Sequence, residues 1–235
     1  MEDKMKRGRL IVIEGSDGSG KATQTKKLYD KLVKQNKKVK KVEFPNYKSE
    51  SSALIKMYLS GEFGKNPDSV NPYASSTFYA VDRFASYKKD WEEFYLKGGI
   101  IIADRYTTSN MIHQAAKIKE VQAKDKFLNW LWDFEFEKFN LPVPDCVIFL
   151  DMPPKCSKSL METRNNKFTG EKEKDIHENN YEYLLESYNN SKYISEKYGW
   201  NRIECTNEDK IKSIDQINDD IIKVITKYID FSEQS

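Results

Sequence analysis

A glycine-rich turn near the start of the chain most strongly limits what this sequence can fold into. Residues 10–25 read LIVIEGSDGSGKATQT: an apolar run, then glycines among small polar residues, then Lys21 and a helical pattern. Glycine lets such a loop turn its N–H groups inward, and the following helix offers further unsatisfied N–H groups to an anion. We therefore expect a strand, a polyphosphate-binding loop and a helix, in this order.

The loop fits the pattern G-x-x-x-x-G-K-[ST] except at its last position, where Ala22 replaces the expected hydroxyl and Thr23 follows one residue late. A glycine-rich strand–helix corner can also be purely structural. The β-type residues before it, the helix formers after it and the mobile charge of Lys21 favour phosphate binding. The residues predicted to bind the nucleotide are Gly15, Ser16, Asp17, Gly18, Ser19, Gly20, Lys21, Ala22 and Thr23.

Length and composition indicate one α/β domain over residues 1–235, with residues 1–8 as a loose leader. The chain has 39 Lys and Arg against 37 Asp and Glu, so its formal charge of +2 gives no basic field for nucleic acid. We find no signal-like segment and no apolar run long enough to span a bilayer. Three widely separated cysteines suit a reducing compartment. We expect a cytoplasmic protein without nucleic-acid or membrane partners.

Short apolar strands alternate with helices, which predicts a parallel sheet covered by helices on both faces. The expected strands are 10–14, 39–44, 100–103, 146–150 and 202–205. The expected helices are 21–36, 51–59, 71–97, 107–117, 123–139, 153–164, 176–198 and 211–229. Ligands of such sheets bind beyond the carboxyl ends of the strands, so the loops after the first four strands are the ones that matter.

The loop after the second strand and the helix at 71–97 carry aromatic and charged residues. In Phe44-Pro45-Asn46-Tyr47 the aromatics can line a pocket, or they can be core residues beside a proline that ends the strand. Tyr79 and Arg83 are four residues apart and share a helix face. Together they can stack on a planar base and bond its edge. A surface ion pair with a core tyrosine is the alternative.

Asp104 and Arg105 follow the third strand at the ligand edge. Arg105 can clasp a phosphate, while Asp104 can hold Arg105 or bind hydrated magnesium. A structural salt bridge is the alternative, and the location favours function. After the fourth strand, Asp151 is either a Walker-B type acid or a helix cap.

The motifs together resemble the thymidylate kinase family of P-loop nucleoside monophosphate kinases. The matching pieces, over about residues 9–205, are EGSDGSGKATQ, FPNY, YAVDR, DRYTTSN and FLDMPP followed by a basic loop. The resemblance implies a three-layer P-loop kinase fold, with five parallel strands, helices on both faces and a small lid at about 164–178. It also implies a homodimer that uses ATP and Mg²⁺ to phosphorylate dTMP to dTDP in dTTP biosynthesis.

The resemblance further implies roles for individual residues. Tyr79 would stack on thymine, Arg83 and Asn110 would bond the base edge, and Arg105 would hold the acceptor phosphate. The full set implied to bind the acceptor is Phe44, Pro45, Tyr47, Tyr79, Arg83, Arg105, Ser109 and Asn110. The implied catalytic residues are Asp17, Lys21, Arg105 and Arg164, and the implied metal ligands are Asp17 and Asp104.

The chain departs from the family pattern at several positions. Ala22 lacks the usual hydroxyl ligand of magnesium, and Asn46 stands where an arginine is frequent. The phosphate loop has no arginine, so a transition-state cation must come from elsewhere. The basic loop supplies Lys167, Lys172 and Lys174, and Arg164 lies at its edge. His113 stands where some relatives have a tyrosine near the sugar.

Two alternatives stay open at this point. One is another P-loop kinase, acting on a different nucleotide or on a deoxynucleoside. The other is a degenerate nucleotide-binding module, which Ala22 alone supports. A GTPase is disfavoured because no N-K-x-D guanine signature lies near the fourth or fifth strand.

Overall fold

The computed structural model describes residues 7–162, 176–177, 180–208 and 210–231 of the 235-residue chain. Most of the predicted leader and all of the predicted lid except residues 176–177 lie outside this part, and so does Arg164. At the described end of the leader, Gly8 N donates to Tyr95 O at 2.8 Å, which fixes the chain just before the first strand.

Five parallel strands form one sheet with the order β2-β3-β1-β4-β5. They are β1 (Arg9–Gly15), β2 (Val39–Glu43), β3 (Ile100–Asp104), β4 (Cys146–Asp151) and β5 (Asn201–Glu204). β1 lies at the centre and is buried along all but its first residue. Its continuous apolar run is the pattern expected of a strand covered on both faces, and the predicted α/β class with a five-stranded parallel sheet is confirmed.

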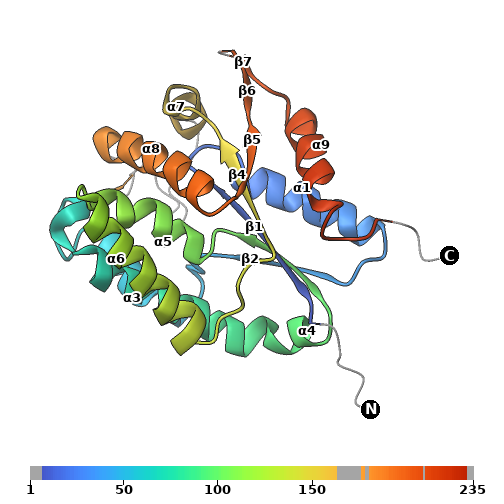
Figure 1. Cartoon of the computed structure of the whole chain (residues 1–235), viewed down its shortest axis with the longest axis horizontal. Helices are drawn as coiled ribbons and strands as arrows, with labels where there is room; N and C mark the ends of the chain where they lie inside the picture. Colours follow the sequence, from blue (N-terminus) through green and yellow to red (C-terminus); the bar gives the residue numbers. More distant parts are fainter. Residues whose placement is uncertain (1–6, 163–175, 178–179, 209, 232–235) are drawn as a thin grey trace.

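Helices cover both faces of this sheet (Figure 1). One face of β1, with Ile11 and Ile13, packs on α1 (Lys21–Lys34) and α9 (Ile214–Ile225). The other face, with Leu10 and Val12, packs on a second group of helices. That group contains α3 (Pro72–Ser86), α4 (Glu92–Leu96), α5 (Thr107–His113), α6 (Val121–Trp132) and α8 (Tyr181–Lys197). Side chains alternate between the two faces of the strand, and helices cover each face, so the fold has three layers with the sheet in the middle.

Two predicted long helices change their pitch near their ends. The helix predicted at 71–97 is α3 and α4 joined by the π-helical turn η3 (Tyr87–Trp91). The helix predicted at 123–139 is α6 followed by the π-helical turn η5 (Asp133–Lys138). A π turn takes in one more residue than an α turn, so it rotates the following side chains relative to the 3.6-residue period. In η5 the consecutive residues Glu135 and Phe136 are both buried.

The chain after β5 differs most from the prediction. Ile211 was assigned to the last helix, but it lies in a hairpin of β6 (Thr206–Asn207) and β7 (Lys210–Ile211). The helix begins at Ile214 because Ser213 and Gln216 form a capping box. Likewise α8 begins at Tyr181, later than predicted, because Asn180 accepts a hydrogen bond from Tyr183 N.

The remaining elements are short and connect the layers. The helix predicted at 51–59 is α2 (Ala53–Leu59), preceded by the 3-10 turn η1 (Glu50–Ser52). A second 3-10 turn, η2 (Pro67–Ser69), precedes α3, and a third, η4 (Ala115–Lys117), follows α5. The helix after β4 is α7 (Pro154–Glu162). No helix in the described ranges is both long and apolar enough to cross a membrane.

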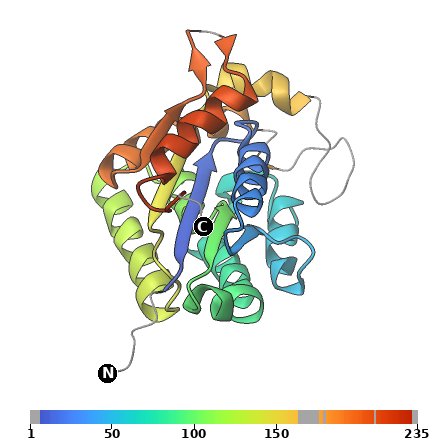
Figure 2. The ribbon, with the colours of Figure 1, turned by 90° about the vertical axis from the view of Figure 1, so that its right-hand side faces the viewer.

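The register of the sheet brings the important loops to one edge. Ile13 of β1 lies opposite Asp104 of β3, and Glu43 of β2 lies opposite the same residue. Figure 2 shows β1 running toward the turn into α1, at the same end of the molecule as α7. The loops after β1, β2, β3 and β4 therefore emerge side by side.

Candidate active site

The phosphate loop between β1 and α1 has the backbone that its glycines predict. Gly18 and Gly20 have φ of 76° and 86°, in the left-handed region that favours glycine. A Cβ added at Gly15 would lie 2.6 Å from Ser19 Oγ and 3.0 Å from Leu150 O, so the loop packs tightly on β4. At Gly20 no atom lies within 4 Å of such a Cβ, so this side of the loop is open to a ligand.

Lys21 lies against the phosphate loop. Its Nζ donates to Gly15 O at 2.9 Å and to Ser16 O at 2.8 Å, and it lies 3.9 Å from Asp17 Oδ1. The side chain is buried, so its charge is directed at the loop and not at bulk solvent. Ala22 and Thr23 follow in the first turn of α1 and are exposed.

Arg105 joins the phosphate loop to the loop after β3. Its Nη2 donates to Asp17 Oδ1 at 2.5 Å, and its Nη1 donates to Ser109 Oγ at 3.2 Å. Burial opposes its charge, but the carboxylates of Asp17, Glu14 and Asp104 outweigh this and raise the pKa of Arg105. The guanidinium thus stays charged beside Lys21, and two cations face the same edge of the sheet.

His113 lies on the far side of Arg105 from the phosphate loop. Its Nε2 lies 2.9 Å from Arg105 Nη1. Burial, together with the charge of Arg105, holds the pKa of His113 well below its usual value, so the ring is neutral and Nε2 accepts the hydrogen bond. The hydrogen then sits on Nδ1, which is buried and has no partner among the described residues. His113 therefore keeps a buried donor without a partner among the described residues, next to Arg105.

Asp104 neither pairs with Arg105 through a hydrogen bond nor sits in a salt bridge. It is 2% exposed, and neither carboxylate oxygen has a hydrogen-bond partner within the described part of the chain. Mg²⁺ in phosphotransferases is usually held by one or two carboxylates, by water and by substrate phosphates. An unsatisfied carboxylate at the ligand edge fits that donor set. Accordingly, the described residues contain no cluster of three or more His, Cys, Asp or Glu side chains that could cage a metal by themselves.

The loop after β2 is tied to α3 by a residue that the prediction did not single out. Asp82 accepts from Asn46 N at 2.8 Å and from Ser51 Oγ at 2.6 Å. Phe44 is buried in the core against Tyr106, with ring centroids 5.9 Å apart, so the core alternative holds for this aromatic. Pro45 and Tyr47 are half-buried beside it.

Arg83 lies inside the protein and not at its surface. Its Nε and Nη2 donate to the two carboxylate oxygens of Glu135 at 2.7 and 2.6 Å, and both side chains are almost fully buried. The predicted alternative of a surface ion pair is therefore wrong, because η5 brings Glu135 under α3. Tyr79, one turn earlier on the same helix, is half-buried and packs against the cluster that contains Ile55, Tyr58 and Leu59 of α2. Asn110 Nδ2 donates to Ser76 O at 3.4 Å, which places α5 against the same face of α3.

Asp151 is bound by side chains from two other elements, and its role as a Walker-B type acid or a helix cap stays a prediction. Its carboxylate accepts from Tyr188 Oη at 2.7 Å and from Arg202 Nε at 2.6 Å. It thereby ties β4 to α8 and β5 behind the phosphate loop.

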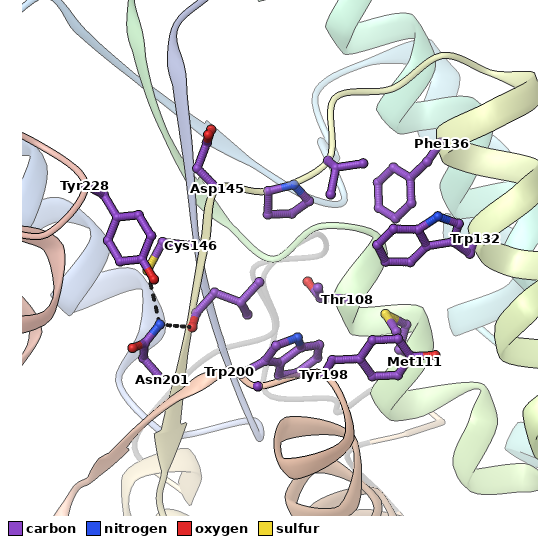
Figure 3. Close-up of a pocket in the computed structure, with 14 residues that line it drawn as sticks. Thr108, Met111, Trp132, Phe136, Asp145, Cys146, Tyr198, Trp200, Asn201 and Tyr228 are labelled. Atoms are coloured by element: carbon purple, nitrogen blue, oxygen red, sulfur yellow. Dashed lines mark hydrogen bonds between the residues drawn. The ribbon is translucent and has the colours of Figure 1, made fainter.

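A cavity of about 150 Å³ lies at the other end of the strands, where β4 begins. Figure 3 shows its walls, which are mostly aromatic and apolar and include Met111, Trp132 and Trp200. The charged residue at its border, Asp145, is bound by Arg9 and by Leu10 N. None of the residues predicted to bind substrate lines this cavity, so the active-site candidate remains the loop edge.

Comparison with known proteins agrees with this fold. A family model described as thymidylate kinase matches residues 13–209. The chain belongs to the thymidylate kinase family. It is 28% identical to the thymidylate kinase of Plasmodium falciparum over 227 residues, which cover 97% of this chain and 94% of that protein. It is 35% identical to the Schizosaccharomyces pombe thymidylate kinase over 152 residues, or 65% of each chain.

A solved structure confirms the fold. The thymidylate kinase of Candida albicans superposes with a TM-score of 0.71 at 22% sequence identity, over 96% of this chain and 94% of that one. The predicted resemblance to the family and the predicted P-loop kinase architecture are thus confirmed, whereas the roles of individual site residues stay predictions.

The buried pair of Arg83 and Glu135 yields a stability prediction. Glu135→Ala leaves a buried guanidinium without its partner, which should lower the free energy of unfolding by about 3–5 kcal/mol. Chemical denaturation monitored by circular dichroism measures this. Glu137→Ala, an exposed residue of the same turn, should change stability by no more than about 0.5 kcal/mol. Equal effects of the two substitutions would contradict the assignment of a buried pair.

Proposed function

We propose that this protein transfers the γ-phosphoryl group of ATP to dTMP, giving dTDP. The observation that carries the proposal is the contact between Arg105 and Asp17, because it joins a phosphate-binding loop to a second cation-bearing loop at one sheet edge. The phosphates of a donor and an acceptor nucleotide must lie next to each other for the transfer, so each needs a cationic binding site adjacent to the other. Membership of the thymidylate kinase family supports dTMP as the nucleotide that binds at the second half-site.

The donor half-site is the phosphate loop. Backbone N–H groups of residues 15–23 would surround the ATP phosphates, and Lys21 would turn from the loop carbonyls to the outer phosphates. Because the acceptor phosphate is already an anion, the reaction needs no strong general base. Positioning and charge neutralisation would therefore supply most of the rate enhancement.

The acceptor half-site lies between α3 and α5. Tyr79 would stack on thymine, and Asn110 would bond the base edge. Arg83 has one terminal nitrogen, Nη1, that Glu135 does not occupy; it lies 3.4 Å from Tyr106 O, and we assign it to the base side. Arg105 and Tyr47 would hold the acceptor phosphate, while Pro45 borders the pocket and Phe44 supports it from the core.

We propose Mg²⁺ as the cofactor beside ATP. The ion would neutralise charge on the donor phosphates, and Asp104 is the side chain best suited to hold its water ligands. Asp17 is already bound by Arg105, so we assign it to orienting that arginine and the acceptor more than to the metal. Arg164 lies outside the described residues, and its role as a lid cation remains a prediction.

We also propose that the protein is a homodimer in the cytoplasm. The outer side of α3 exposes Tyr73, Val81 and Phe84, each about 40% or more accessible, which form one apolar stripe of the helix. Burial of such a stripe against a second copy stabilises a dimer. The three cysteines are buried and no disulfide joins them, which supports a reducing environment.

A panel of nucleoside monophosphates tests the substrate. With ATP and Mg²⁺ in a coupled spectrophotometric assay, dTMP should give the highest kcat/KM, because a base that leaves Asn110 or Arg83 unpaired loses binding in the transition state. Equal rates with dUMP, dCMP or dGMP would contradict the thymine assignment. ATP binding without turnover of any acceptor would instead favour a degenerate nucleotide-binding module.

Arg105→Ala tests the acceptor half-site. Loss of charge-assisted hydrogen bonds to the acceptor phosphate should raise the KM for dTMP roughly 10- to 100-fold and lower kcat, while the affinity for ATP changes little. Steady-state kinetics with each substrate varied in turn measures both effects. Arg9→Ala, at the opposite end of β1, is the matched control and should leave both KM values unchanged.

Val81→Glu tests the homodimer. A charge in the apolar stripe of α3 should convert the dimer into a monomer, as measured by sedimentation equilibrium, because like charges would face each other across a two-fold interface. Val33→Glu is the matched control, since Val33 is equally exposed but lies on α1, across the sheet. A wild-type protein that sediments as a monomer at micromolar concentration would rule the dimer out.

A further inference from the structure

Glu14 is a buried carboxylate that the proposed reaction does not use. It is the last residue of β1 before Gly15 and is 0% exposed. By strand alternation it faces the same side as Leu10 and Val12, toward α3 and α5. A charged side chain is rarely placed there unless its partners require it.

Within the described part of the chain, Glu14 accepts hydrogen bonds from the start of α5. Its Oε1 accepts from Tyr106 N at 3.2 Å and from Thr108 Oγ1 at 2.6 Å. Ser109 Oγ lies 2.9 Å from both carboxylate oxygens. Burial raises the pKa of Glu14, whereas the charges of Arg105 and Lys21 and these hydrogen bonds oppose the shift. Tyr106 N–H can only donate, and the Ser109 hydroxyl, which accepts from Arg105, donates its own hydrogen, so Glu14 is the acceptor in both contacts.

These contacts enclose the backbone of Arg105. Arg105 has φ of +68°, a left-handed conformation that non-glycine residues rarely adopt. Its own N–H donates to Ile13 O at 3.1 Å, and the next N–H along the chain, that of Tyr106, donates to Glu14. Consecutive peptide groups on both sides of the strained residue are thus bound by consecutive residues of β1. Such strain persists only where the surroundings over-determine it.

Glu14 also reaches the side chain of Arg105. Ser109 Oγ donates its hydrogen to Glu14 and accepts one from Arg105 Nη1 at 3.2 Å. The same guanidinium then reaches Asp17 of the phosphate loop, three residues after Glu14. A closed ring of contacts therefore runs from β1 through Ser109 and Arg105 back to the loop that β1 feeds.

We propose that Glu14 is a positioning residue for the acceptor phosphate, which it serves by fixing both the backbone and the guanidinium of Arg105 against the phosphate loop. The inference rests on the proposed function only in that Arg105 meets an acceptor phosphate. It does not depend on which base the acceptor carries. A purely structural Glu14 would instead stabilise the fold without a preference for either substrate.

A double-mutant cycle between Glu14 and Arg105 separates these two roles. Glu14→Gln keeps the size of the side chain and an acceptor for Tyr106 N–H, but its amide donates toward Ser109. We expect the KM for the acceptor to rise roughly tenfold, the loss typical of one charge-assisted hydrogen bond, with the KM for ATP unchanged. In the Arg105→Ala background, Glu14→Gln should have no further effect on acceptor KM, because it acts through Arg105.

The controls make each outcome decisive. Glu204→Gln, an exposed glutamate at the end of the parallel strand β5, should change neither KM. Additive effects in the cycle, or equal rises in both KM values, would overturn the proposal in favour of a structural role. If Glu14→Gln lowers the melting temperature sharply, Ser109→Ala replaces it, because this substitution removes the contact between Glu14 and Arg105 at its other end. The double-mutant cycle is then measured with Ser109→Ala and Arg105→Ala.

The cycle is measured with whichever monophosphate the wild-type protein uses best. A wrong assignment of thymine would therefore change the compound but not the test of Glu14. If the wild-type protein phosphorylates no acceptor, the proposed function is contradicted independently of Glu14. The affinity for dTMP is then measured by isothermal titration calorimetry for the wild-type protein, the two single variants and the double variant, and these four affinities complete the double-mutant cycle.

Discussion

The parallel pairing of β1 with β3 and β4 is the constraint on which the whole site depends. Neighbouring strands of a sheet lie about 4.8 Å apart, so loops that leave adjacent parallel strands at matched register begin almost in contact. With Ile13 opposite Asp104, the residue after β3 must lie beside the phosphate loop. The meeting of Arg105 and Asp17 follows from this register, without any long connection to bring them together.

The sequence predicts those parts of the fold and of the candidate site that depend on residues close together in the chain. Apolar runs indicated β1, β3 and β4, and the glycines with Lys21 indicated the phosphate loop. The acidic and basic pair at 104–105 was expected at the ligand edge because it follows a buried strand directly. Such features depend on a few consecutive residues, and tertiary packing agrees with them here.

The features that sequence did not predict are long-range or break the regular period. Nothing near Arg83 indicates Glu135, because the two are 52 positions apart and the π turn η5 changes which residues face inward. The motif that contains Asp82 does not indicate its partners, because it accepts hydrogen bonds from residues 46 and 51, more than 30 positions earlier in the chain. Glu14 is indicated by the sequence, because it is an acidic residue directly after the apolar run of the central strand and must have partners there.

The proposed function gives helix α3 two roles, one toward the acceptor nucleotide and one toward a second copy of the chain. Tyr79 packs against α2 and Arg83 pairs with Glu135 of η5, whereas Val81 and Phe84 are exposed. Through Asp82 the same helix also holds the loop after β2. If contact with a second copy changed the order of this helix, the affinity for the acceptor would change with it, and by reciprocity the acceptor would change subunit association by the same factor. Protein concentration would then affect the measured affinity for the acceptor.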